Sequence, residues 1–154
     1  MAATLFTTTL FTTMARALLA ANLLAAGAVH ASAAVVISDD HGGQIGPYLA
    51  KYEALRSSGE AVEIDGVCAS ACTMLLGLIP HDRICVTPRA VLEFHAAWDP
   101  ALSGDHVVNA DGNRILWSHY PGNVREWISR HGGLQPRILY LRGPELDAMY
   151  RPCR

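Results

Sequence analysis

Short apolar runs and helical stripes of apolar residues follow one another along the chain from residue 34 onward. Residues 34–38 and 61–67 are short, β-branched or apolar runs of the kind that forms buried strands. In residues 47–58, apolar positions recur every three or four residues, which predicts an amphipathic helix. Pro47 suits the first turn of that helix, and Gly59 suits its C-terminal stop.

The same alternation continues through the middle of the chain. Residues 69–79 are almost uniformly small and apolar, which predicts a helix that is buried on most sides. Residues 83–87 and 90–95 predict two further strands, separated by Pro88. Strands and helices that alternate with short connections predict an α/β domain whose mainly parallel sheet is covered by helices.

The C-terminal third has a weaker pattern. Residues 98–113 contain several turn-forming residues and predict a loop, whereas residues 114–120 and 123–130 predict helices. The 154-residue chain is short enough that residues 34–154 are expected to form a single domain.

Residues 1–33 differ in kind from the rest of the chain. Arg16 is the one charged residue in residues 1–16, and residues 17–29 form an uncharged Ala/Leu-rich stretch. Small residues at alternate positions follow, so a secretory signal peptide with cleavage after Ala31 or Ala33 is predicted. An uncleaved anchor is the alternative, although the apolar run is short beside the roughly 20 residues of a membrane-spanning helix. The mature protein is therefore expected to be periplasmic or secreted, without a stable membrane span.

Charge and cysteine content narrow the picture further. The formal net charge is -2, and Lys51 is the only lysine, so the basic surface of a nucleic-acid-binding protein is absent. Because export leads to an oxidising compartment, the even set of cysteines predicts disulfides, and three pairings are compatible with the sequence. These cysteines are Cys68, Cys72, Cys85 and Cys153.

Residues that could take part in catalysis lie where predicted strands end. Ser70 begins a predicted helix directly after a strand, and its ordinary role there would be to cap the helix. His95 ends a later strand, and the Gly42-Gly43 pair ends the first one. In an open parallel sheet these strand ends share one edge, where ligands bind. A serine nucleophile, a histidine base and a turn rich in free N–H groups are the parts of an acyl-transfer site.

Three segments carry a resemblance to a known family. They are HGG at 41–43, CASACTMLLGLI at 68–79 and DRICVTPRAVLEFH at 82–95. Their order and spacing resemble the proteolytic subunit of the Clp protease and its crotonase-fold relatives, and more closely the exported Clp-like proteins of proteobacteria. The resemblance covers about half of the mature chain. It implies a ClpP/crotonase-like fold, Ser70 as nucleophile, His95 as base and Gly42-Gly43 as the oxyanion turn.

The resemblance also implies partners and a third catalytic residue. A peptide or another acyl compound would be the substrate, without a cofactor, and a homo-oligomer is common in the family. The acid position of the family falls on Ile138 here, so the later acids Asp147 and Glu145 are the first candidates for that role. The weaker candidates are Asp39, Asp40 and Asp99.

Two other functions are compatible with the sequence. Cys68, Cys72 and His95 could bind a soft metal such as copper if the cysteines were reduced, although no dedicated metal site is predicted. Alternatively, the protein could be a periplasmic scaffold or binding protein that keeps the fold without the chemistry.

Overall fold

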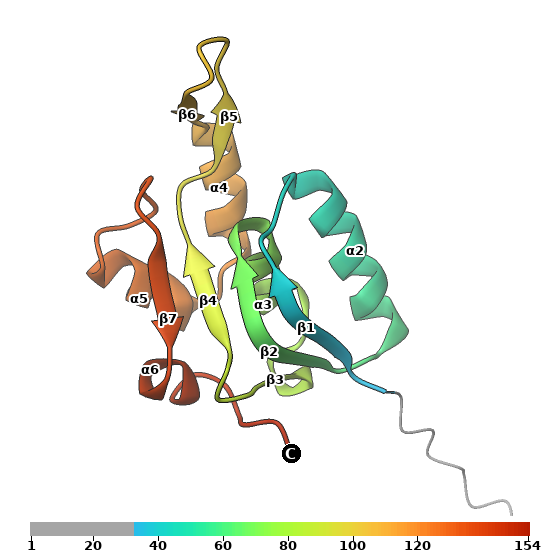
Figure 1. Ribbon diagram of the computed structural model, residues 1–154. Coiled ribbons are helices and arrows are strands. Elements are labelled where there is room, and N and C mark those ends of the chain that lie inside the picture. The colour runs from blue at the N-terminus through green and yellow to red at the C-terminus, as the bar shows by residue number, and fades with distance from the viewer. Residues whose placement is uncertain (1–32) are drawn as a thin grey trace, which may run out of the picture. The chain divides into compact units, whose positions relative to one another are not determined.

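The structure is a computed structural model that describes residues 33–154. The predicted signal peptide lies, except for Ala33, outside the described residues. The described part is an α/β domain with a mainly parallel sheet (Figure 1). In chain order its elements are β1 (Val35–Asp40), α2 (Ile45–Ser58), β2 (Val62–Ala69), the 3₁₀-helix η1 (Ser70–Met74), α3 (Leu75–Leu78), the 3₁₀-helix η2 (His81–Arg83), β3 (Ile84–Val86), β4 (Val91–Phe94), β5 (Trp98–Pro100), β6 (His106–Val108), α4 (Ala110–His119), α5 (Gly122–Arg130), β7 (Leu139–Arg142) and α6 (Pro144–Asp147).

The main sheet has the strand order β1-β2-β4-β7, and β3 also pairs with β2. Strands β1, β3 and β4 are parallel to β2, as predicted, whereas β7 is antiparallel to β4. The first half of β2 pairs with β3 and its second half with β4, so these two strands occupy one position beside β2. Figure 1 shows the β5–β6 hairpin beyond one end of the sheet and α6 with the C-terminus at the other.

The β1–α2–β2 unit forms as the hydrophobic pattern predicts. The buried residues of α2 are Tyr52 and Leu55, on the apolar side of the helix, and Gly59 ends the helix with a φ of 81°. Gly66 of β2 packs against the backbone of β1, since a β-carbon there would be 1.9 Å from the Ser38 carbonyl oxygen. Glycine is therefore required at this position of the strand.

The helix predicted over residues 69–79 is shorter and of a different type. The chain forms a 3₁₀-helix over Ser70–Met74 and then one α-helical turn over Leu75–Leu78. The 3₁₀-helix has i→i+3 bonds and a tighter turn than an α-helix. A disulfide between Cys68 and Cys72 spans its beginning. Burial of the segment is confirmed, because Ala71 through Leu76 are all buried.

Two C-terminal segments differ from the prediction. The stretch 98–113 is not a loop throughout, because it contains the β5–β6 hairpin and the start of α4. Asn109 caps that helix by accepting a hydrogen bond from the Gly112 N–H at 2.7 Å. Strand β7 was not indicated by periodicity, because Tyr140 on its exposed side obscures the alternation of apolar and polar residues.

The register of the sheet brings the predicted site residues to one edge. Asp40 of β1 pairs with Cys68 of β2, and Cys68 pairs in turn with Leu92 of β4. Because these strands are parallel, the residues that follow this row leave the sheet at the same edge. Gly42, Ser70 and His95 all come within three residues of the row.

The predicted disulfides are confirmed. Cys68 pairs with Cys72 and Cys85 with Cys153, and no free cysteine occurs in residues 33–154. The second bridge ties the C-terminal tail to β3, and backbone hydrogen bonds between Val86 and the tail support it. Among the helices of residues 33–154, none combines the length and apolar character of a membrane span.

The two disulfides are expected to differ in their contribution to stability. A cross-link restricts the unfolded chain more when it closes a longer loop. The observed sequence separations are 68 for Cys85–Cys153 and 4 for Cys68–Cys72. From the chain-entropy relation, Cys85→Ala/Cys153→Ala should lower the free energy of unfolding by about 4 kcal/mol, and Cys68→Ala/Cys72→Ala by about 2 kcal/mol. Urea unfolding of the two double variants beside the wild type measures this difference. Equal losses, or the reverse order, would contradict it.

Candidate active site

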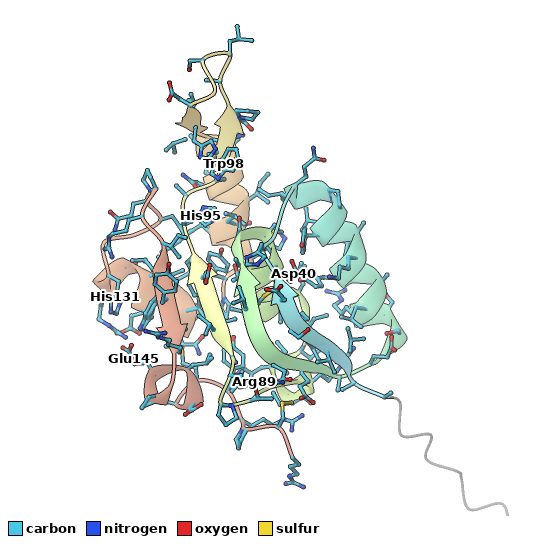
Figure 2. The ribbon with its side chains drawn as sticks, viewed as in Figure 1. Asp40, Arg89, His95, Trp98, His131 and Glu145 are labelled. Carbon is cyan, nitrogen blue, oxygen red and sulfur yellow. A yellow bond between two sulfur atoms is a disulfide. The ribbon has the colours of Figure 1, made fainter. Side chains whose placement is uncertain are left out.

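The residues predicted for catalysis line one pocket at the carboxyl edge of the sheet. Ser70, His95, Gly42 and Gly43 all contribute to this pocket, which has a volume of about 770 Å³. Figure 2 shows His95 at the end of β4, with Trp98 beyond it at the base of the β5–β6 hairpin. The other walls include the following residues of the hairpin and α4: Trp98, Pro100, Asn109, Ile115 and Leu116.

Ser70 has an unusual backbone conformation. Its φ is 54°, and it is the one residue other than glycine with a positive φ among those that the structure describes. A side chain in this left-handed region costs free energy, and such residues concentrate at functional sites. The ordinary role of the serine, capping the helix, is not observed: Ala69 is the N-cap of η1 and the helix has no side-chain cap bond.

The turn after β1 packs directly against the Ser70 backbone. Gly42 has a φ of 78°, and a β-carbon on it would lie 2.5 Å from the Ala69 carbonyl oxygen and 2.8 Å from the Ser70 β-carbon. Only glycine fits such a contact. A β-carbon on Gly43, in contrast, would meet only Tyr48, at 3.7 Å.

Asp40 anchors this turn. Its carboxylate accepts hydrogen bonds from the Gly42 N–H at 3.0 Å, from the Tyr48 hydroxyl, and from Lys51 Nζ at 3.3 Å. Partial burial alone would raise the pKa of Asp40, but the hydrogen bonds that it accepts outweigh this and hold the pKa below its usual value. Burial, together with the bond to the carboxylate, raises the pKa of Tyr48 to about 12, so the phenol remains a donor.

The Gly42 amide is therefore already occupied, which changes the expected source of oxyanion donors. The sequence predicts both Gly42 and Gly43 in this role, but the Gly42 N–H points to Asp40. The Gly43 N–H remains as one candidate. Ala71 supplies another, because the first N–H groups of a helix lack acceptors within it and the Ala71 nitrogen is close to Gly42.

The His95 ring is held by the backbone carbonyl of the next residue, Ala96, and not by an acid. Its Nδ1 lies 2.8 Å from the Ala96 carbonyl oxygen, which can only accept a hydrogen bond. In the neutral ring the proton is therefore on Nδ1, and Nε2 has the free lone pair of a general base. No hydrogen bond joins Ser70 to His95 within residues 33–154, although both line the same pocket.

The structure places the first acid candidates, Glu145 and Asp147, far from this edge. Strand β7 pairs Leu139 with Phe94 and then runs away from His95, so α6 follows at the opposite end of the sheet. Figure 2 shows Glu145 at that end. Its Oε1 accepts a hydrogen bond of 3.0 Å from the Trp127 indole, a bond between α6 and α5.

The weaker acid candidates have other partners as well. Asp39 pairs with His41 at 3.0 Å on the surface, and Asp40 anchors the Gly42 turn. Asp99 lines the main pocket, where it accepts a hydrogen bond of 2.7 Å from Asn109. None of these carboxylates contacts the His95 ring through a hydrogen bond in the described part of the chain.

Ile138 lies where the family resemblance places the acid. It directly precedes Leu139, the cross-strand partner of Phe94, so Ile138 comes beside His95. Both residues line a second pocket of about 260 Å³, whose other walls include Trp98, Val108 and Pro136. The environment of the imidazole on this side is therefore mostly apolar.

The disulfides remove the thiolates on which copper binding would depend. Cys68 and Cys72 are bonded to each other and fully buried. A cluster of Glu63 with Cys85 and Cys153 also has the compactness of a metal site. Its two sulfurs form the second disulfide, so neither is a thiolate ligand.

Several residues that shape the site were not predicted from the sequence. Tyr48 and Lys51 anchor the Gly42 turn through Asp40, and Thr73 donates a hydrogen bond of 2.6 Å to the Ser70 carbonyl. These contacts join separate elements, so no local motif indicates them. The walls from α4 could have been found from its Asn109 N-cap, which is a recognisable helix start.

Neither the comparison with models of known protein families nor the search among curated proteins finds a match to this chain. The residues of the pocket and their contacts are therefore the observations from which a function can be inferred.

Replacing Gly42 and Gly43 separately tests the packing of the turn. Gly42→Ala should lower the free energy of unfolding by at least about 2 kcal/mol, because it adds both a left-handed alanine and a steric clash. Gly43→Ala should cost less than Gly42→Ala, because its β-carbon would meet only the Tyr48 ring, at 3.7 Å, so that its cost would come from the backbone φ of 158° without a steric clash. Urea unfolding of both variants is the measurement, and a tolerated Gly42→Ala would show that the turn does not pack as described.

Proposed function

We propose that the protein is an exported serine hydrolase that acts on a peptide or another acyl substrate. The observation that carries the proposal is the left-handed φ of Ser70, the first residue of η1 after β2. Ser70 lines a pocket that His95 also lines. The serine does not cap its helix, so capping does not explain why the chain adopts this unfavourable conformation.

The proposed chemistry divides the reaction into two displacements. Ser70 Oγ attacks the acyl carbon while His95 Nε2 takes the hydroxyl proton, and the carbonyl oxygen gains negative charge. The Gly43 and Ala71 N–H groups are the proposed donors to that oxygen. The carbonyl then re-forms, the bond to the leaving group breaks, and His95 returns the proton to the leaving group. Water repeats the sequence on the acyl-enzyme and regenerates Ser70.

The ClpP/crotonase-like assignment is part of the same proposal. The order of the motifs along the chain supports it, as does a mainly parallel sheet whose carboxyl edge gathers the glycine turn, the serine and the histidine. The proposed departure from that family is a Ser-His dyad. The Ala96 carbonyl fixes the imidazole tautomer in place of a carboxylate. Because a carbonyl has no full charge, it would stabilise the imidazolium less than an acid does.

One observation favours a scaffold or binding protein as the second candidate. Ile138 leaves the imidazole without an acid, and loss of the acid in a triad lowers the rate by about 10⁴-fold. A protein that keeps the pocket for binding alone would be insensitive to that loss. The second candidate predicts a folded protein with ligand binding and no turnover.

Ser70→Ala and His95→Ala test the hydrolase proposal directly. Each should lower kcat for ester or peptide hydrolysis by about 10³-fold or more, and the double variant should be little worse, because the two residues act as a unit. Ser57→Ala, which replaces an exposed serine of α2 outside the pocket, is a matched control that should retain turnover within about threefold. Hydrolysis screened with all four variants and the wild type is the measurement. Equal activity in wild type and Ser70→Ala would contradict the proposal.

Export is the remaining part of the proposal. Two disulfides are compatible with an extracellular or periplasmic protein, because such bonds persist in oxidising compartments. Intact-mass analysis of the periplasmic fraction should give a mature chain that begins at Ser32 or Ala34. Full-length chain in the cytosol, with four free thiols, would contradict export.

A further inference from the structure

The conformation of Ser70 needs support from outside the residue itself. A left-handed backbone is unfavourable for a residue with a β-carbon, so it persists only where the surroundings determine it. Ser70 begins a short 3₁₀-helix, and such a helix has poorer hydrogen-bond geometry than an α-helix. The helix alone is therefore a weak restraint on the first residue.

The Cys68–Cys72 disulfide encloses Ser70 symmetrically. Cys68 is in β2, two residues before the serine, and Cys72 is in η1, two residues after it. The bridge holds their α-carbons 5.4 Å apart, and both cysteines are 0% exposed. The bridge thus adds a covalent cross-link between the strand side and the helix side of Ser70, beside the peptide chain itself.

Hydrogen bonds hold the helix side of this small ring in place. Tyr52 of α2 donates to the Cys72 carbonyl at 3.0 Å, and Thr73 donates to the Ser70 carbonyl at 2.6 Å. Thr73 is 0% exposed, and the Tyr120 hydroxyl oxygen is 2.9 Å from its own hydroxyl oxygen. The disulfide therefore joins β2 to a segment that is already fixed to α2 and to the residue after α4.

The bridge is expected to be the smaller contributor to stability of the two. A sequence separation of 4 removes less entropy from the unfolded chain than the separation of 68 that Cys85–Cys153 spans on another part of the domain. The bridge that should stabilise the fold more is therefore Cys85–Cys153, which is remote from the pocket. The short bridge is placed where it affects the geometry of one residue.

We propose that the Cys68–Cys72 disulfide is a positioning device that holds Ser70 in its reactive conformation, so that the site becomes competent only when this bridge has formed. This inference rests on the proposed hydrolase function. Formation of the bridge removes two protons and two electrons from the two thiols, and a disulfide donor accepts them and becomes a dithiol. Because both cysteines are buried, competence would be gained once, during folding in an oxidising compartment, and then kept.

Two double variants of the full, exported chain separate positioning from stability. Each is treated with a fluorophosphonate at a temperature where circular dichroism shows it to be folded. Cys68→Ala/Cys72→Ala should lower the maximal rate of serine modification by about tenfold to a hundredfold, as expected for a displacement of about 1 Å, with the half-saturating probe concentration unchanged. Cys85→Ala/Cys153→Ala, the matched control, should keep its rate within about twofold despite a larger loss of thermal stability.

The outcomes distinguish this inference from the proposed function. A folded wild type that does not react with the probe would reject the hydrolase proposal and the inference with it. A reactive wild type and an equally reactive Cys68→Ala/Cys72→Ala would overturn the inference alone. Losses of rate in both double variants that follow their losses of stability would also overturn it, because they would show a purely structural bridge.

A second measurement applies if the Cys68→Ala/Cys72→Ala protein does not fold. Wild-type protein is unfolded, reduced and then refolded with a disulfide donor, and alkylation followed by peptide mapping reports which bridge has formed at each time. Serine modification should appear together with the formation of Cys68–Cys72. Modification that appears before this bridge has formed, or that follows Cys85–Cys153 instead, would overturn the inference.

Discussion

The contact between the Gly42 α-carbon and the Ala69–Ala71 backbone is the constraint on which the rest of the site depends. A β-carbon on Gly42 would come within 2.5 Å of a carbonyl oxygen, so the turn after β1 can approach the turn after β2 only through a glycine. The β1–β2 register brings the two turns to the same level, and Asp40 fixes the first of them from behind. The left-handed Ser70 lies directly against this contact.

In the proposed dyad, His95 would transfer protons without the help of a carboxylate. The Ala96 carbonyl orients the ring and selects its tautomer, which is the geometric part of what an acid does. The electrostatic part is missing, because Ile138 fills the adjacent position with an apolar side chain. If the protein is a hydrolase, we expect its rate to depend on the alignment of Ser70 more than on stabilisation of the imidazolium.

Much of the fold was predictable because local patterns and tertiary packing agree. The alternation of strand and helix through β4 follows from residues that are apolar at positions the sheet buries, such as Val62 and Ile64. Strands β5 and β6 were not predictable, since all of their residues are exposed and no apolar pattern marks a buried side. In β7 the alternation of buried and exposed positions is obscured by Tyr140, an exposed aromatic residue. The 3₁₀ form of η1 depends on three-dimensional contacts that no pattern of apolar residues encodes.

The site was predictable in its parts but not in its connections. Ser70, His95 and the glycine turn could be proposed from strand ends, because parallel strands share an edge. The disulfide pairing could not be chosen, since it depends on the C-terminal tail reaching β3. The contribution of Tyr48 and Lys51 to the anchoring of the Gly42 turn was also hidden, because their hydrogen bonds to Asp40 join α2 to the end of β1.

The most direct test of the central claim is peptide mapping of folded, oxidised protein after reaction with a fluorophosphonate. The account predicts a single adduct, on the peptide that contains Ser70, and its loss in His95→Ala. An adduct on a serine outside the pocket, or a well-folded protein that remains unmodified, would contradict the assignment of Ser70 as a nucleophile.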